Sequence, residues 1–216
     1  MGALKGGIVP VTPFQQNCLL LWDDETKAAA VVDPGGDVDR ILAAITQNGL
    51  DVNTILLTHG HMDHAGGAAA LQDALPGKPP IVGPDSRDKF LLDGLESQGR
   101  QYGIADARNV SPDRWLVEGE AVMVGPHRFA VLHCPGHTPG HIVFVNDATK
   151  LIVMGDVLFN GSVGRTDFPY GDGAALIEAI TTKLLPLGDD FSFVCGHGPG
   201  STLGAERRDN PFLQSS

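Results

Sequence analysis

The segment that most limits the fold and chemistry open to this chain is THGHMDH at residues 58–64, which places three histidines and one aspartate within six residues. It directly follows a short apolar run that is typical of a buried strand, so these side chains are expected on a loop at a strand end. Imidazole and carboxylate groups are ligands that suit zinc, iron or manganese. If His59 and His61 point one way while Asp63 and His64 point another, the loop can serve two adjacent cations. The alternative interpretation is a solvated histidine-rich turn with a helix-capping aspartate.

Three more candidate ligands stand just after predicted strands, and these are His137, Asp156 and His197. Loops from several strand ends commonly converge to build a metal site. His141 competes with His137 for one role. We favour His137 because it lies in the turn, whereas His141 opens the following strand and can pack or cap there.

The remaining histidines and the cysteines next to these turns are assigned other roles. His127 and His133 are expected to be structural or exposed. Cys134 and Cys195 flank two of the ligand turns, but the ligand set is complete without a thiolate. Asp33, at the end of a predicted strand, is expected to orient a ligand, as metal sites generally require.

The hydrophobic pattern indicates a layered α/β domain with two sheets covered by helices. Helices are predicted after an Asp37 cap and up to Gly49, and from the THGHMDH segment to about Leu75. Two more are predicted at residues 85–92 and 174–184, with a glycine-rich loop after residue 92. The predicted strands lie at residues 8–11, 18–22, 28–33, 54–57, 121–124, 129–133, 142–145, 151–154 and 191–195.

Composition narrows the functional class. The 216 residues suit one domain, and no apolar run approaches the roughly 20 residues that a membrane helix needs. We expect no membrane association and, without a secretory signal at the N-terminus, a cytoplasmic protein whose three cysteines stay reduced. A net charge of −11 with no basic cluster argues against nucleic acid as a partner.

The motifs together resemble the metallo-β-lactamase superfamily from about Ile8 to the C-terminus. They are the THGHMDH block, GHTPGH at 136–141, Gly155-Asp156 and GHGP at 196–199. The chain looks most like short bacterial glyoxalase II-like hydroxyacylglutathione hydrolases, on VDPGG at 32–36, GRTDF at 164–168 and STLGAER at 201–207. This resemblance implies an α/β fold of the αββα sandwich type, with residues 1–216 as one hydrolase domain. Only 19 residues follow His197, so the helical glutathione-binding domain of full-length glyoxalase II is not expected.

The resemblance also implies a ligand set for two divalent cations, with zinc expected and iron or manganese possible. One metal would be held by His59, His61 and His137. The second would be held by Asp63, His64 and His197, and Asp156 would bridge both. All seven positions carry the residue type of the family. Asp63 could also take up a proton during catalysis.

The activity implied is hydrolysis of a small-molecule thioester, S-D-lactoylglutathione or a related hydroxyacyl conjugate. Arg165 lies where the resembling hydrolases place a cation near the glutathione moiety, although it could instead pair with Asp167. Tyr170 is expected to stack on or bond the substrate.

Two other functions remain open at this point. The GRTDF segment also resembles persulfide dioxygenases, in which matches of His59, His137 and Asp156 hold one iron. A non-catalytic metal-binding protein is the third interpretation. An intact set of seven ligands and the GHGP segment favour the hydrolase.

Overall fold

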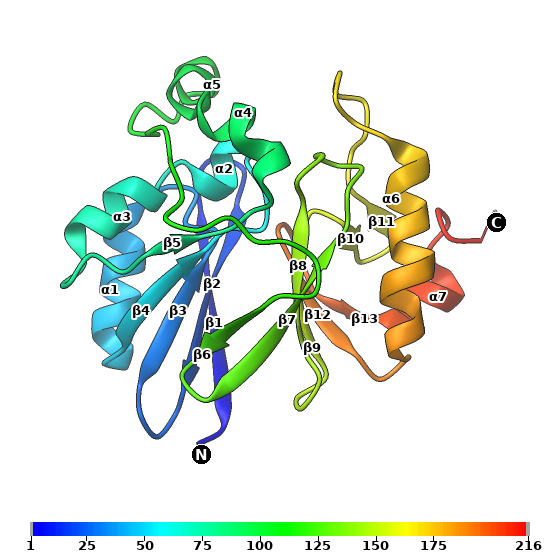
Figure 1. The fold of residues 1–216 in the computed structure, drawn as a ribbon, viewed down its shortest axis with the longest axis horizontal. Helices are drawn as coiled ribbons and strands as arrows, with labels where there is room; N and C mark the ends of the chain where they lie inside the picture. Colours follow the sequence, from blue (N-terminus) through cyan, green and yellow to red (C-terminus); the bar gives the residue numbers. More distant parts are fainter. Residues whose placement is uncertain (1, 215–216) are drawn as a thin grey trace.

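In the computed structural model, which describes residues 2–214, two β-sheets pack face to face and helices cover their outer faces (Figure 1). The first sheet has the order β1-β2-β3-β4-β5. Its strands are Leu4–Val11, Gln16–Asp23, Ala28–Val32, Asp51–Leu56 and Ile81–Val82. The second sheet has the order β13-β12-β9-β8-β7-β6. In chain order its strands are β6 Ala121–Val124, β7 His127–His133, β8 Ile142–Asn146, β9 Leu151–Gly155, β12 Ser192–Cys195 and β13 Ser201–Thr202. A small hairpin of β10 (Leu158–Phe159) and β11 (Ser162–Val163) follows β9.

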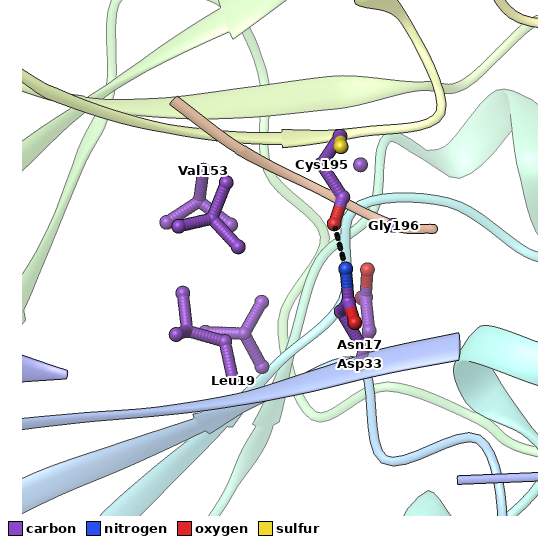
Figure 2. Close-up of a pocket in the computed structure, with 9 residues that line it drawn as sticks. Asn17, Leu19, Asp33, Val153, Cys195 and Gly196 are labelled. Carbon is purple, nitrogen blue, oxygen red and sulfur yellow. Dashed lines mark hydrogen bonds between the residues drawn. The ribbon is translucent and has the colours of Figure 1, made fainter. Parts of the chain in front are cut away.

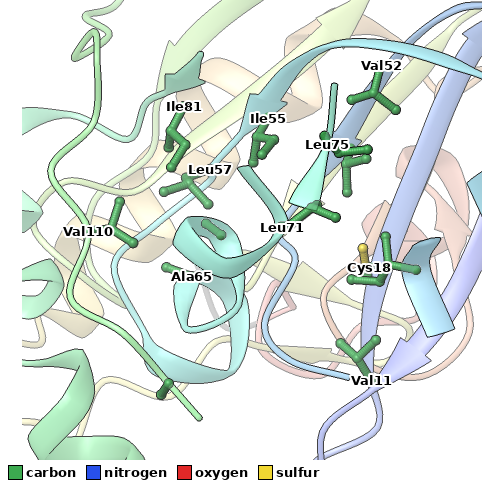
Figure 3. Packing of buried hydrophobic residues seen from close by; sticks show 14 of the residues in the cluster. Val11, Cys18, Val52, Ile55, Leu57, Ala65, Leu71, Leu75, Ile81 and Val110 are labelled. Carbon is green, nitrogen blue, oxygen red and sulfur yellow. The ribbon is translucent and has the colours of Figure 1, made fainter. Parts of the chain in front are cut away.

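The helices form the two outer layers. Next to the first sheet lie α1 (Val38–Asn48), α2 (Met62–Ala65) and α3 (Ala68–Ala74). Their apolar side chains pack with those of β2 and β4 in one buried cluster, in which Figure 3 shows Leu71 and Ala65 near Ile55 and Leu57. The second sheet is covered by α6 (Gly173–Ala179), the helical turns Ile180–Leu184 and Leu185–Leu187, and α7 (Leu203–Asp209). This arrangement confirms the predicted αββα sandwich.

A third apolar cluster fills the space between the sheets. It includes Leu21 and Leu56 from the first sheet and Phe129 and Phe144 from the second, each at most 1% exposed. All five residues of β8 are buried because this strand has the core on one face and helices on the other. Burial of such large apolar side chains is the main favourable term in folding.

Strand direction explains why the candidate ligands meet. β3 and β4 run parallel in the first sheet, and β9 and β12 run parallel in the second. The loops that leave their carboxyl ends carry Asp33, the 58–64 segment, Asp156 and His197, so these groups emerge at one edge of the sandwich. The loop between β7 and β8 brings His137 to the same edge.

Several predicted helices differ from the observed ones. The second predicted helix is divided at Gly66 and Gly67 into α2 and α3, and the 174–184 helix changes to a wider π-helical turn after Ala179. The predicted helix at residues 85–92 is a 3₁₀ turn at Ser86–Asp88 followed by one helical turn, α4 (Lys89–Leu92).

Two further predictions differ from the structure. Asp37 occupies the N-cap position of α1, as predicted, but its side chain does not cap the helix: its backbone is left-handed and its carboxylate accepts a hydrogen bond from the Thr12 amide at 2.7 Å. The loop predicted after residue 92 contains helix α5 (Leu95–Tyr102), which buries Leu95. Gly94 and Gly99 weakened the helical pattern there, and tertiary packing overrides that local preference.

Among residues 2–214, no helix combines the length and the apolar character that are needed to cross a bilayer.

Candidate metal centre

Three of the predicted ligands form one compact group of ring nitrogens. His59 Nε2 lies 3.2 Å from His61 Nδ1, which in turn lies 3.0 Å from His137 Nε2. His59 is fully buried and His137 is 4% exposed. The loop after β4 and the loop after β7 thus supply three nitrogens that face a common point. We call this group the histidine triad.

Three more predicted ligands form a second group beside the first. His64 Nε2 lies 3.4 Å from His197 Nε2, and His197 Nε2 lies 3.2 Å from Asp63 Oδ2. The loop after β12 supplies His197, whereas Asp63 and His64 come from the first turn of α2. The ligand atoms of Asp63, His64 and His197 all lie within 4.8 Å of one another. We call this group the mixed triad.

Asp156 lies between the two groups. Its Oδ2 is 3.6 Å from His137 Nε2 in the histidine triad and 3.6 Å from His197 Nε2 in the mixed triad, and its Oδ1 is 3.4 Å from His64 Nε2. Oδ1 is buried and has no hydrogen-bond partner among the described residues. The charge of nearby histidines, above all His64, lowers the pKa of Asp156 although burial acts in the opposite direction, so this carboxylate is ionised.

Hydrogen bonds behind the rings fix which nitrogen of each histidine carries the proton. His137 Nδ1 lies 2.8 Å from the carbonyl of Arg165, and His197 Nδ1 lies 3.2 Å from the carbonyl of Phe14. A carbonyl only accepts, so both Nδ1 atoms carry a proton. Burial lowers the pKa of His137, so its Nε2 keeps a lone pair, whereas the hydrogen bond to Asp63 raises the pKa of His197 although burial acts in the opposite direction.

His64 and His59 are held through Asp33, which thereby orients a ligand as the sequence predicted. Its buried carboxylate accepts from His64 Nδ1 at 2.9 Å and from the Thr58 hydroxyl at 2.6 Å. Because Thr58 donates its only hydroxyl proton to Asp33, its oxygen accepts from His59 Nδ1 at 3.0 Å. Such partners behind the ligands are characteristic of metal sites.

The loop that carries His197 is tied to strand β2 by Asn17. The Asn17 side chain donates to the carbonyls of Cys195 and Gly198, both at 2.9 Å, and the first of these bonds is drawn in Figure 2. Gly196 is required between them, because a Cβ there would lie 2.0 Å from Asp156 Oδ1 and 2.5 Å from His64 Cε1. The close approach of this loop therefore leaves no space for a side chain.

These groups fit bound cations. Each triad gathers three ligand atoms within 4.8 Å of one another, a spacing at which one cation can contact all three. Burial and the neighbouring His137 lower the pKa of His61 to about 3, and burial also lowers the pKa of His59, so both rings are neutral donors. Neutral imidazoles with an ionised carboxylate are a suitable donor set for divalent metals.

The structure distinguishes His137 from its competitor. His141 Nε2 accepts the backbone amide of Asp156 at 3.0 Å, and its ring stacks on His59 with 4.6 Å between the centroids. His141 is therefore engaged behind the cluster, and His137 presents its nitrogen to it.

The other histidines and the cysteines lie outside both groups. His127 pairs with Asp23 at 3.0 Å, and His133 contacts Arg87 and the carbonyl of Pro139. Burial raises the pKa of Cys134 to about 12 and that of Cys195 to about 11, so both thiols stay protonated.

The two predicted substrate contacts lie beside the histidine triad. Arg165 makes a bidentate ion pair with Asp167, both bonds at 3.0 Å, and its guanidinium lies 4.9 Å from the Phe168 ring centre. The alternative pairing considered from the sequence is thus present, and the Arg165 side chain is still 70% exposed. The Tyr170 hydroxyl lies 2.8 Å from His61 Nε2, so it also orients a candidate ligand.

Sequence reasoning missed an aromatic cluster beside the His61 ring. Phe168 stacks on Tyr170 with 5.4 Å between centroids and lies 5.1 Å from the His61 ring, while Phe90 meets the other side of Tyr170 at 5.3 Å. Phe90 comes from α4, about 80 residues earlier in the chain, so no local pattern could place it here.

A family model for the metallo-β-lactamase superfamily matches residues 11–197. The chain belongs to the metallo-β-lactamase superfamily. Among curated relatives, hydroxyacylglutathione hydrolase GloC of Haemophilus influenzae is 48% identical over 96% of this chain and 97% of its own length. A probable metallo-hydrolase of Bacillus subtilis, YqgX, is 34% identical over 97% of the chain and 98% of its own length. This chain is therefore a metal-dependent hydrolase, and the predicted superfamily is confirmed.

Solved structures agree with this assignment. The crystal structure of the B3 metallo-β-lactamase BLEG-1 has a TM-score of 0.88 at 33% identity, covering 98% of this chain and all of that one. TTHA1623, solved in a di-iron-bound form, has a TM-score of 0.85 at 39% identity, with 96% of this chain and all of that chain covered.

Proposed function

We propose that this superfamily member is a dinuclear thioester hydrolase that cleaves S-D-lactoylglutathione or a related hydroxyacyl thioester into a hydroxy acid and a thiol. The observation that carries the proposal is the position of Asp156 between two complete ligand groups, with one carboxylate oxygen that lacks a partner. The similarity to hydroxyacylglutathione hydrolase GloC and to TTHA1623 in its di-iron-bound form supports the proposal.

The histidine triad would hold one cation, the mixed triad would hold the other, and Asp156 would contact both. Bound there, two divalent cations would supply Lewis acidity, which lowers the pKa of water toward about 7 and stabilises negative charge on a carbonyl oxygen. Zinc is the expected metal, with iron or manganese as alternatives, because imidazole and carboxylate suit all three.

The chain's own residues then orient the reactants and move the proton. Asp63, a member of the mixed triad whose side chain is 14% exposed, would also accept a proton from the attacking water. The leaving group needs little help from an acid, because a thiol has a pKa of only about 8.5 and departs as a thiolate. Hydrolysis of this kind requires no serine or cysteine nucleophile.

Arg165 and Tyr170 are the proposed substrate contacts. Arg165 is exposed beside the histidine triad and can exchange its partner Asp167 for a carboxylate of the glutathione moiety. Tyr170 offers a half-buried ring on the stack with Phe168, against which an acyl or peptide group can pack. In this proposal residues 1–216 act as one hydrolase domain.

The proposal is tested by assaying metal-loaded protein with S-D-lactoylglutathione while free thiol is measured. We expect release of one thiol per thioester, with activity abolished by a chelator and restored by zinc. A parallel assay measures oxygen uptake on glutathione persulfide. Oxygen consumption without thioester cleavage would replace the hydrolase with the dioxygenase alternative, and turnover of neither substrate would favour a binding role.

A further inference from the structure

A buried carboxylate outside the ligand set connects the two loops that build the histidine triad. Asp88 belongs to the 3₁₀ turn before α4 and is fully buried. It was not singled out by the sequence, because its segment DSRDKF carries no metal-site pattern. A carboxylate removed from water in this way needs partners that compensate for its lost hydration.

Two of the three partners of Asp88 are adjacent to a candidate ligand. Its Oδ2 accepts from the backbone amide of Gly60 at 2.9 Å and from the hydroxyl of Thr138 at 2.7 Å. Its Oδ1 accepts from the backbone amide of Gly140 at 2.5 Å. Gly60 lies between His59 and His61, and Thr138 directly follows His137.

The contact between Asp88 and the 137–140 loop leaves no space for a side chain at position 140. A Cβ on Gly140 would lie 2.7 Å from Asp88 Oδ1 and 2.6 Å from the Asp88 amide nitrogen. Burial raises the pKa of Asp88 to about 6, while its three hydrogen bonds act in the opposite direction, so the carboxylate is mainly ionised at neutral pH. Charge-assisted bonds of this type are about twice as strong as neutral ones.

We infer that Asp88 is a positioning residue that holds the 58–61 and 137–140 loops together and thereby sets the metal affinity of the histidine triad, but not that of the mixed triad. The inference rests on the metal centre described under Proposed function. Asp88 contacts none of the seven candidate ligands through its side chain in the described part of the chain, so its effect passes through the loop backbones and Thr138.

Asp88→Asn is the sharpest test because it keeps the size of the side chain. An amide offers one acceptor oxygen instead of two, so either Gly140 or the pair Gly60 and Thr138 then faces an NH₂ group. Asp85→Asn is the matched control. Asp85 lies on the same turn, is 3% exposed, and its side chain accepts from the Arg87 amide rather than from either loop.

Metal affinity is measured on metal-free protein by competition for Zn²⁺ with a chromophoric chelator, in two backgrounds. His197→Ala removes a ligand of the mixed triad, so the remaining zinc reports the histidine triad. His61→Ala does the reverse. We expect Asp88→Asn to weaken zinc binding about 10- to 100-fold in the His197→Ala background, the usual effect of losing a partner behind the ligands. In the His61→Ala background it should have less than a threefold effect, and Asp85→Asn should have little effect in both.

Equal weakening in both backgrounds would show that Asp88 is a general structural residue and overturn the inference. Unchanged affinity in the His197→Ala background, or no zinc there for Asp88→Asn to weaken, would overturn it as well. Thermal unfolding of each metal-free variant separates a loss of fold from a loss of affinity. Failure of wild-type protein to cleave thioesters would refute the proposed activity, yet the zinc affinities would still decide the role of Asp88.

Discussion

The buried carboxylate of Asp33 accepts a hydrogen bond from His64 Nδ1 at 2.9 Å. It also accepts hydrogen bonds from the backbone amide and the hydroxyl of Thr58. One residue at the end of β3 thereby orients His64 in the mixed triad directly and His59 in the histidine triad through Thr58. Its backbone is left-handed, with φ of 52°, a conformation that asparagine also tolerates.

The Asp33→Asn variant should therefore fold normally but bind metal more weakly than the wild-type protein. The amide NH₂ would face a donor, either His64 Nδ1 or Thr58, and the ligand ring would lose its fixed orientation. We expect zinc affinity to fall roughly 10- to 100-fold, as is usual for partners behind metal ligands. Zinc titration of the metal-free variant measures this, and wild-type affinity would show that Asp33 does not orient His64.

Removal of the Asp156 carboxylate should weaken the binding of both metals. Asp156 is the one candidate ligand within 3.6 Å of nitrogens from both triads in the described chain. Asp156→Ala should lose activity and retain well under two metal equivalents after dialysis. Elemental analysis that still finds two full equivalents would contradict a shared carboxylate, and His127→Gln, outside both groups, is the control.

The cysteines next to the ligand loops should be dispensable for metal binding. Cys195 Sγ faces the carbonyls of His197 and Pro199, and Cys134 is packed in the apolar cluster under α6. Replacing both by Ser should leave metal stoichiometry unchanged, although thermal stability can fall because a buried thiol becomes a hydroxyl. Loss of one metal equivalent on either substitution would require a thiolate ligand.

The ion pair between Arg165 and Asp167 makes substrate recognition testable in both directions. Arg165→Ala should raise KM for lactoylglutathione about tenfold, since a bidentate pair with a substrate carboxylate is lost from an exposed position. Asp167→Asn should lower KM because it frees the guanidinium. A small thioester without carboxylates should respond to neither change.

If Arg165→Ala impaired both substrates equally, Arg165 would be a structural residue of its loop. If it impaired neither, the thiol carrier would be recognised elsewhere.

The resemblance of the motifs to a known family predicted the superfamily and the αββα sandwich. The residues that gather at the edge of the sandwich could be predicted from the pattern itself, because strand ends and metal-ligand residue types are local features. The preference for His137 over His141 rested on its place in the turn, and the structure shows the two rings in different roles. Asp88 and Phe90 could not be found in this way. Their importance comes from contacts with loops about 30 to 80 residues away, and such contacts leave no periodic pattern.

Errors in the helices have a similar origin. Asp37 has a residue type that commonly caps helices, but its carboxylate accepts a hydrogen bond from the amide of Thr12, 25 residues earlier in the chain. Gly94 and Gly99 predicted a loop, yet Leu95 is completely buried and the α5 helix forms around that contact. Tertiary packing decides both cases against the local preference.

The requirement for two metals can be measured by adding Zn²⁺ stepwise to metal-free protein while thioester hydrolysis is followed. We expect the rate to rise until two equivalents are bound and then to stop rising, with both equivalents confirmed by elemental analysis. A rate that reaches its maximum at one equivalent, or no hydrolysis at two, would contradict this requirement.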